Sequence, residues 1–385
     1  MNKNMNIVII GAGPAGLYSA YLLRKKYPDY KITIIEKEKY AGGRTRMVNY
    51  EGVDIVTGAG VGRKEKDMLL QRLLNNLGFT VPEYPSRHYY IKGIKHTFNI
   101  WVKKLFANIN KVKRMPFRAF GIKTLGESEY KKFVTATAYG DFEAADCKDV
   151  MQYDGFADHI SSFTILKMPW NDLIHKLSIN ENIVYNTTII KINKDKKEII
   201  ASNNKIYKYD KLIVATTIDT IKHLFPEKSI YSKIKGEPFL RMYGKFSDNC
   251  IDIIKNKIRG RTVVGAPLQE IIPINQDKGV YMISYSDNKN AIFLRNKNKE
   301  YFEQLLTKIL DLEYPISLDS IQPYFWKIGI HYNLPLPAKY NSREEFMEDA
   351  QMPYDNIFIV GEVVALDHGW TESALETVES IINKI

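Results

Sequence analysis

Residues 7–16 read IVIIGAGPAG, an apolar run that leads directly into a glycine-rich turn. The β-branched residues Ile7 to Ile10 are typical of a strand buried on both faces of a parallel sheet. Apolar residues then recur at helical spacing as far as Leu23. The segment therefore predicts a strand, a tight turn and a helix, which together form the first half of a Rossmann βαβ unit.

A second apolar run, residues 31–35, ends in Glu36, where an acid can accept hydrogen bonds from a ribose. In the turn, Gly11 allows the sharp bend, Gly13 lets the backbone approach a pyrophosphate, and Gly16 allows close packing of helix on strand. The helix N-terminus faces the phosphates. We therefore predict a dinucleotide site. Its first contacts are Gly11, Gly13, Pro14, Ala15, Gly16, Glu36 and Lys37.

The length of 385 residues and a hydrophobic fraction of 45% predict one large domain or two closely joined ones. The formal net charge of +11 comes mostly from lysine, so we interpret it as solvated surface charge and expect no nucleic-acid partner. Two cysteines, Cys147 and Cys250, exclude a disulfide framework and favour a reducing, cytoplasmic compartment. Glycines and a proline interrupt the apolar stretch 7–23, so we expect no membrane span.

The glycine-rich turn alone does not distinguish FAD from NAD, but two further segments do. After Glu36 comes a second glycine pair, Gly42 and Gly43, followed by Arg44 and Thr45, whose cation could offset phosphate charge. Near the C-terminus, an apolar strand at 356–360 ends in Gly361-Glu362, and the segment GWTESAL at 369–375 opens an amphipathic helix.

This ordered combination of GAGPAG, GGRT and GWTESA resembles the flavin-containing amine oxidase superfamily, which includes monoamine, polyamine and L-amino-acid oxidases. The resemblance covers essentially the whole chain and is strongest at 7–62, 205–225 and 355–380. It implies an α/β fold, with a Rossmann-like FAD-binding domain and a discontinuous α+β substrate-binding domain. It also implies FAD as the cofactor, held non-covalently because neither cysteine lies in the C-terminal flavin segments.

The domain division follows from the same resemblance. The FAD-binding domain would comprise residues 1–80, 183–235 and 346–385, and the substrate-binding domain residues 81–182 and 236–345. Within these domains, residue patterns predict a leucine-rich core helix from Asp67 to Gly78 and a mainly helical stretch over 81–182. They also predict a lysine-rich hairpin at 191–208, strands at 209–216, 239–246, 280–285 and 291–294, and a helix at 300–312.

By the same resemblance, further segments would contact FAD. Gly58-Ala59-Gly60 would pass along the flavin ring, and the strand at Ile189 would touch the adenine. Glu362 would meet the ribityl-pyrophosphate. The backbone at Glu372, Ser373 and Ala374 would meet the flavin pyrimidine, where a helix N-terminus stabilises the negative charge of a reduced flavin. The implied set adds Gly42, Gly43, Arg44, Thr45, Gly58, Ala59, Gly60, Ile189, Gly361, Glu362, Glu372, Ser373 and Ala374.

On the substrate side, the family commonly places two aromatic residues beside the flavin, together with a lysine that holds a water. Trp370 matches the first aromatic residue, and Tyr332 is the better candidate for the second within residues 326–332. The position of the lysine is occupied by Arg241, with Lys245 on the same strand face as a fallback. An arginine stays protonated and could bind a substrate carboxylate, which puts rapid monoamine-type oxidation in doubt.

The resemblance thus predicts an FAD-dependent oxidoreductase that transfers a hydride from an amine carbon to flavin, with dioxygen as acceptor. The alternatives are a related desaturase or sugar-nucleotide mutase, or a flavoprotein without turnover. We expect a small amine as substrate, a possible homodimer, and no metal site, because the seven histidines are scattered. The basic, aromatic stretch 89–123 is interpreted as a solvated helical surface. Its alternatives are a membrane-surface helix, a nucleic-acid face or an electropositive mouth.

Overall fold

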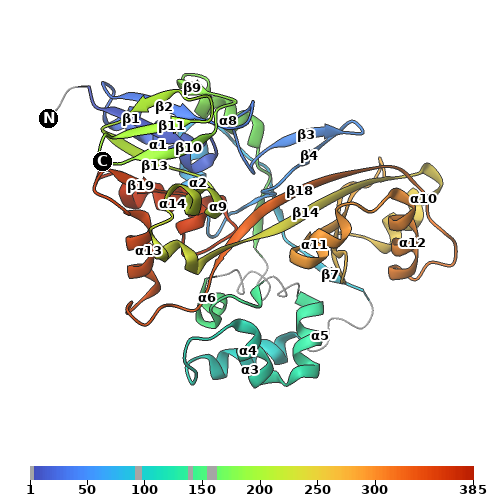
Figure 1. Cartoon of the computed structure of the whole chain (residues 1–385). Helices are drawn as coiled ribbons and strands as arrows, with labels where there is room; N and C mark the ends of the chain where they lie inside the picture. Colours follow the sequence, from blue (N-terminus) through green and yellow to red (C-terminus); the bar gives the residue numbers. More distant parts are fainter. Residues whose placement is uncertain (1–3, 92–97, 138–141, 154–162) are drawn as a thin grey trace.

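The strand expected at residues 7–10 is the centre of a five-stranded parallel sheet in the computed structural model, which describes residues 4–91, 98–137, 142–153 and 163–385 (Figure 1). Its isoleucines alternate between the two faces, with Ile7 and Ile9 in one hydrophobic cluster and Val8 and Ile10 in another. In sheet order the strands are β19 (Ile357–Ile359), β13 (Lys211–Val214), β1 (Asn6–Ile10), β2 (Lys31–Ile35) and β9 (Ile183–Val184).

Helices cover one face of this sheet, and a smaller sheet with two helices covers the other. On the first face lie α1 (Pro14–Lys26), α2 (Met68–Asn76), α8 (Trp170–Ser178) and α14 (Thr371–Ile381). On the second lie β10 (Ile189–Asn193), β11 (Glu198–Ala201), β12 (Ile206–Lys208), α9 (Ile218–Leu224), the 3-10 helix η3 (Ser229–Lys233), α13 (Arg343–Gln351) and the 3-10 helix η4 (Glu362–Val364). The predicted α/β class with a Rossmann-like unit is confirmed.

Two sequence expectations change in detail. The single hairpin expected at 191–208 is a three-stranded antiparallel sheet, because the chain reverses twice between β10 and β12. Helix α8 falls within the predicted substrate-binding range 81–182, yet Trp170, Leu173 and Leu177 are buried in the cluster that contains α1. Its packing therefore places α8 with the parallel sheet.

A six-stranded sheet forms the second half of the molecule. Its strands β14 and β18 are long and antiparallel, and Figure 1 shows them running from beside the parallel sheet to the opposite end, where α10, α11 and α12 lie. In sheet order the strands are β18 (Leu318–Asn333), β14 (Ile234–Phe246), β17 (Val280–Asp287), β16 (Gln269–Asn275), β15 (Arg261–Gly265) and β7 (His88–Tyr90).

Each face of the six-stranded sheet has its own cover. Helices α10 (Asp248–Lys257), α11 (Asn288–Leu294) and α12 (Lys299–Ile309) pack on one face. The hairpin β3 (Met47–Tyr50) and β4 (Val53–Val56) packs on the other face, around the buried Tyr243. Short strands β5 (Gly62–Arg63), β6 (Glu83–Pro85) and β8 (Thr164–Leu166) form a separate small sheet.

The strand predicted at 291–294 is wrong, because these residues form the end of helix α11. Four consecutive apolar residues fit either a strand or a buried helix. In the structure Ala291 and Leu294, three positions apart, are buried, whereas Ile292 and Phe293 between them are about half exposed. That spacing is helical.

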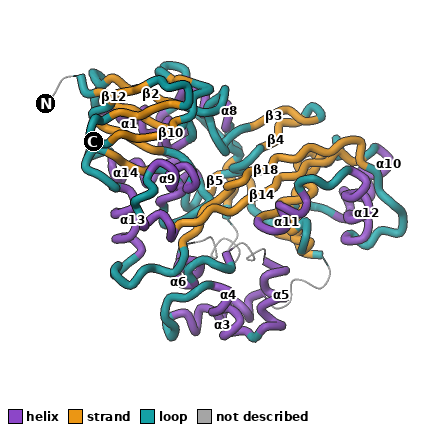
Figure 2. The backbone as a smooth tube through the Cα atoms, viewed as in Figure 1, coloured by secondary structure: helices purple, strands orange, loops and turns teal. Residues whose placement is uncertain are grey.

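A separate group of helices, seen below the long strands in Figure 2, contains most of the basic stretch 89–123. Phe117, Phe120 and Phe133 are fully buried at its centre, while Lys103 and Lys104 are exposed on its surface. This placement supports the interpretation of a solvated surface over an aromatic core. Lys92 and Lys95 lie outside the described residues. The helices are α3 (Phe98–Ile109), α4 (Phe117–Leu125), α5 (Glu127–Thr137) and α6 (Cys147–Gln152).

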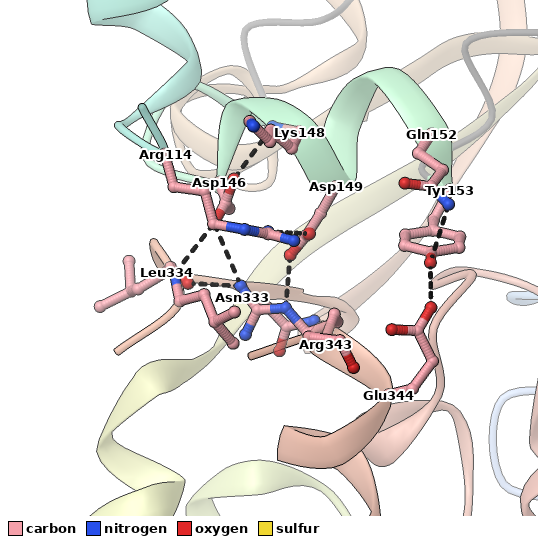
Figure 3. Close-up of polar contacts among 12 residues, drawn as sticks. Arg114, Asp146, Lys148, Asp149, Gln152, Tyr153, Asn333, Leu334, Arg343 and Glu344 are labelled. Atoms are coloured by element: carbon pink, nitrogen blue, oxygen red, sulfur yellow. Dashed lines mark hydrogen bonds and ion pairs between the residues drawn. The ribbon is translucent and has the colours of Figure 1, made fainter. Parts of the chain in front are cut away.

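A buried cluster of charges joins this helical group to α13 (Figure 3). The Asp146 carboxylate accepts hydrogen bonds from Arg114 Nη1 at 2.9 Å and Arg343 Nη2 at 3.3 Å. Asp149 accepts from Arg114 Nη1 at 2.6 Å and contacts Arg343 Nε at the same distance. Asp146 and Arg343 are at most 1% exposed and Arg114 is 26% exposed, so two arginines and two aspartates balance one another in a largely buried cluster. In the described part of the chain, no helix is long and apolar enough to cross a membrane.

Candidate functional site

A cleft of about 1580 Å³ lies between the parallel sheet and the six-stranded sheet. Ile10 and Ile35, at the carboxyl ends of β1 and β2, line it together with Ala215 after β13. The chain proceeds from β1 to β2 on one side and returns later to β13 on the other, so the cleft opens where the strand order reverses. Ligands of open α/β sheets bind at such points. The volume exceeds the range of roughly 300–1,000 Å³ that is usual for small-ligand pockets.

The three glycines of the 7–16 turn differ in what a side chain at each position would meet. Gly11 has φ +103°, and a Cβ there would lie 2.4 Å from the Ala215 carbonyl oxygen. A Cβ on Gly16 would lie 1.9 Å from the Gly11 carbonyl oxygen. Gly13 differs, because a Cβ there would meet no atom of the protein within 4 Å, and the residue lines the cleft. The structure therefore leaves room for a ligand directly against the Gly13 backbone.

The acid at the end of β2 lies beside this turn. The Glu36 carboxylate accepts hydrogen bonds from Ala12 N at 2.7 Å and Glu38 N at 2.9 Å, which fixes it at the edge of the cleft. Lys37 lines the cleft next to it and is exposed, and Ile189 lines the same region at the start of β10. The fold thus brings together the residues that the sequence assigned to the ribose and adenine.

The second glycine segment packs directly against the first. Gly42 N donates to the Ala12 carbonyl oxygen at 2.8 Å, and a Cβ on Gly43 would lie 3.5 Å from the Gly13 Cα. A Cβ on Gly58 would lie 2.2 Å from the Arg44 carbonyl oxygen. Close approach of these backbones therefore forms one wall of the cleft. Gly43, Arg44, Thr45, Gly58, Ala59 and Gly60 line it, whereas Gly42 is buried behind them.

Glu362 is the centre of a buried hydrogen-bond network beside this wall. Its carboxylate accepts from the backbone N and Nδ1 of His331 at 2.8 and 2.5 Å, from Gly369 N at 3.0 Å and from Arg44 Nη1 at 3.1 Å. Burial alone would raise the pKa of Glu362, but the His331 and Arg44 contacts hold it well below its ordinary value. The segment that enters α14 is therefore tied by one carboxylate to the second glycine segment and to β18.

Two buried histidines support this network, and neither was among the predicted site residues. His331 Nε2 accepts from the Ile218 backbone N at 3.2 Å, so Nδ1 is the nitrogen that carries a proton towards Glu362. His368 lies between the Glu362 carbonyl oxygen at 2.9 Å and Asn333 Nδ2 at 2.8 Å. Burial lowers the pKa of His368 to about 4, so it is neutral at physiological pH. In the sequence, only their proximity to Tyr332 and Trp370 could have pointed to them.

The N-terminus of α14 faces the cleft through a subset of the predicted residues. Trp370, Thr371 and Ala374 line the cleft. Glu372 and Ser373, which were also predicted to contact the flavin, do not line the cleft. The Glu372 carboxylate points to α2 instead, where it accepts from Leu69 N at 2.7 Å and Leu70 N at 2.8 Å. Burial raises the pKa of Glu372 to about 7.

Trp370 is held in place by a cation. The Arg63 guanidinium carbon lies 3.7 Å from the centre of the Trp370 ring, and Arg63 is itself paired with Asp67 at 2.8 Å. Arg63 is 1% exposed, so this contact is desolvated and stronger than a surface cation–π pair. The ring is therefore fixed at the cleft wall.

Two other predicted catalytic residues lie outside the cleft. Tyr332 is buried among the helices of the α3–α6 group and does not line the cleft. The part of β18 that lines the cleft is residues 326–330. Among them, Trp326 is the aromatic residue that reaches the cleft, with Nε1 donating to the Thr57 carbonyl oxygen at 2.7 Å. Lys245 pairs with Asp319 near the far end of β14. Tyr243, on the same strand face, and the β3–β4 hairpin packed on it lie between Lys245 and Arg241.

Arg241, in contrast, lines the cleft although it is only 4% exposed. Its guanidinium carbon lies 3.4 Å from the Tyr285 ring centre and 4.0 Å from that of Phe239. Nη1 contacts Asp287 Oδ1 at 3.3 Å. The structure thus presents a guanidinium, stacked on aromatic rings, where the family lysine was expected.

A buried acid near this site makes a pH-dependent prediction. Burial raises the pKa of Glu237 to about 8, with a further contribution from Asp287. Between pH 4.5 and 8 the folded protein holds a proton that the unfolded chain releases, so this group lowers stability as pH rises towards 8. Replacing Glu237 with Gln should remove that loss. The difference in free energy of unfolding between the variant and wild type should therefore change by about 3 kcal/mol in favour of the variant from pH 5 to pH 8.

The measurement is urea unfolding of wild type and E237Q at both pH values. Other titrating groups are the same in both proteins and cancel in the difference. An equal stability difference at pH 5 and pH 8 would show that Glu237 titrates normally.

In the described residues, no group of three or more His, Cys, Asp or Glu side chains could hold a metal ion.

Comparison with known proteins agrees with this geometry. The family of NAD(P)-binding Rossmann-like domains matches residues 9–77. The chain is 36% identical over 81 residues to prenylcysteine oxidase 1 of Bos taurus, which is 21% of this chain and 16% of that protein. It is 30% identical over 95 residues to an L-amino-acid oxidase of Bothrops pauloensis, which is 23% of this chain and 18% of that protein.

The fold as a whole also has a counterpart. A solved double mutant of putrescine oxidase superposes with a TM-score of 0.73 at 12% identity, covering 99% of this chain and 98% of that one. The sequence relatives match only a small part of their own length, whereas the structural match extends over both chains.

Proposed function

We propose that this chain is an FAD-dependent oxidoreductase of the amine oxidase type that acts on an amine, a proposal supported by its match to NAD(P)-binding Rossmann-like domains and by its superposition on putrescine oxidase. The observation that carries the proposal is the cleft itself. Two glycine segments, the N-terminus of α1 and the N-terminus of α14 meet along one continuous cavity. This arrangement provides for a dinucleotide at one end and a second ligand at the other.

The residues present fit FAD. Gly13 leaves an open approach to its backbone, and the adjacent helix N-terminus would face a pyrophosphate. Glu36 would accept from ribose hydroxyls, while Arg44 would lie beside the phosphates and offset their charge. Cys147 and Cys250 are both buried outside the cleft lining, so we propose non-covalent binding. When bound, FAD would supply the acceptor for a hydride and pass the electron pair to dioxygen, which leaves as peroxide.

The protein's own contribution would be orientation, electrostatics and exclusion of water. Trp370 and Trp326 would flank the reacting amine, which must be neutral to release a hydride from its α-carbon. The N-terminus of α14 would stabilise negative charge at the pyrimidine side of the flavin, through the backbone at Thr371 and Ala374. The imine product would be hydrolysed by water after release.

The test is peroxide release from purified protein across a panel of polyamines, monoamines and amino acids, with FAD content measured on the same samples. Peroxide formation from one amine class supports the proposal. Silence across the panel, with the bound flavin still reducible by dithionite, would contradict amine oxidation. The desaturase, the mutase or the non-catalytic alternative would then stand.

Trp370 offers a prediction that separates catalysis from cofactor binding. Replacing Trp370 with Ala should lower kcat/KM by about 10- to 100-fold, because one wall that positions the substrate is lost. FAD content should change little, since the backbone of α14 remains in place. Stopped-flow reduction of the bound flavin would measure the first effect, and the absorbance ratio of flavin to protein the second. Unchanged kinetics would remove Trp370 from the site.

A further inference from the structure

The wall of the cleft formed by the six-stranded sheet contains a buried cation with unused hydrogen-bonding capacity. Arg241 is 4% exposed and lines the cleft from β14. Of its donors, Nη1 contacts Asp287 Oδ1 at 3.3 Å and the Leu240 carbonyl oxygen at 3.4 Å, both long. Nε is buried and has no hydrogen-bond partner among the described residues. A buried guanidinium whose hydrogen bonds are long or missing is incompletely satisfied by the protein itself.

The orientation of this guanidinium is fixed by its neighbours. Its carbon lies 3.4 Å from the Tyr285 ring centre and 4.0 Å from the Phe239 ring centre, so the group stacks on aromatic rings. Asp287 contacts the Nη1 side. Nε has almost no accessible surface, so Nη2 is the nitrogen left for a ligand in the cleft, where it can donate a charge-assisted hydrogen bond to a carboxylate oxygen.

Exposed positive side chains also line the margin of the cleft. Arg87 and Arg259 are exposed at the cleft margin, and they are close together because β7 pairs with β15 with His88 opposite Arg261. Lys167 also lines the cleft and is exposed. Arg261 is paired with Glu270 at 2.6 Å. Among the described lining residues, none that belongs to the six-stranded sheet is acidic.

We propose that the substrate carries a carboxylate, and that Nη2 of Arg241 binds it inside the cleft. This proposal rests on the proposed function, because it specifies the class of amine that the site accepts. Tyr285 and Phe239 hold the guanidinium, and Arg87 and Arg259 attract the anion to the mouth. A simple polyamine lacks the anionic group and is repelled by the same cations.

The test measures binding without turnover. Phenylacetate and its neutral isostere phenylacetamide are titrated into the purified holoprotein by calorimetry, with inorganic phosphate as a second anion. Phenylacetate should bind at least about 10-fold more tightly than phenylacetamide, as expected for charge-assisted hydrogen bonds to a buried arginine. Equal affinities, or no binding of phenylacetate, would overturn the proposal. Tighter binding of phosphate than of phenylacetate would overturn the carboxylate assignment.

Matched variants localise the effect. Arg241→Met should weaken phenylacetate binding about 10-fold or more, whereas Arg259→Met at the margin should weaken it less than about 3-fold. Arg241→Lys keeps the charge without the planar fork and should fall between wild type and R241M. Wild-type affinity in R241K and R241M would overturn the proposal. If neither variant folds, the comparison of acid and amide in wild type still decides.

The two proposals fail in different ways. FAD content and peroxide release, measured on the same samples, report on the proposed function alone. A yellow, amine-reducible protein that binds acid and amide equally retains the proposed function and loses the carboxylate. A protein without flavin that prefers phenylacetate retains the anion site and loses the oxidase.

Discussion

Gly13→Val is expected to abolish flavin binding while leaving the stability of the apoprotein nearly unchanged. Gly13 has φ −76° and ψ 179°, a conformation that valine adopts freely. A Cβ there would meet no protein atom within 4 Å, and Gly13 lines the cleft, so the first atom of the new side chain fits the fold. The only group that it would displace is one lying against the turn. Loss of two charge-assisted hydrogen bonds to a pyrophosphate corresponds to about 3 kcal/mol or more, a factor of at least ~100 in affinity.

Flavin fluorescence after denaturation measures the bound FAD, and urea unfolding of apoprotein measures the fold. Gly16→Val is the matched control, because its Cβ would lie 1.9 Å from the Gly11 carbonyl oxygen and should disrupt the turn itself. We expect G16V to lose both stability and flavin. A G13V protein that purifies with full FAD would mean that the dinucleotide does not approach this turn.

The second large effect is expected at Glu362. Replacing it with Gln removes the charge that accepts from His331, Gly369 and Arg44, and it places an amide N–H against donors. Removing one partner from a buried, hydrogen-bonded charge network typically costs about 3–5 kcal/mol. Because this network ties the segment before α14 to the second glycine segment, FAD retention should fall as well.

Urea unfolding at neutral pH gives the stability, with Glu83→Gln as the control. Glu83 pairs with Lys64 at 2.5 Å, but both side chains are more than two-fifths exposed, so its loss should cost no more than about 1 kcal/mol. Equal effects of E362Q and E83Q would show that the buried network contributes little to the fold.

The fold was most predictable where the chain encodes it locally. The strand, turn and helix at residues 7–26 follow from a continuous apolar run and from the glycines of the turn, of which Gly11 and Gly16 are required by the fold itself. The amphipathic helices α2 and α14 follow from apolar residues at helical spacing. The strand predicted at 291–294 was wrong because four consecutive apolar residues show neither the helical nor the strand period.

The site was less predictable, because its geometry depends on contacts between distant segments. Lys245 shares a strand face with Arg241, as the sequence indicated, but the β3–β4 hairpin covers that face between them. Tyr332 was favoured over Trp326, and only the path of β18 through the molecule shows which of the two reaches the cleft. The Glu362 network combines four distant segments, and in the sequence its two histidines are marked only by their proximity to Tyr332 and Trp370.

The most direct test of flavin-dependent amine oxidation in this cleft is the absorption spectrum of the purified protein, recorded without oxygen before and after addition of an amine. We expect a yellow protein whose flavin absorbance bleaches with an amine that carries a carboxylate and returns when air is admitted. A colourless protein that takes up no FAD on reconstitution would contradict the assignment of the cofactor and of the function built on it.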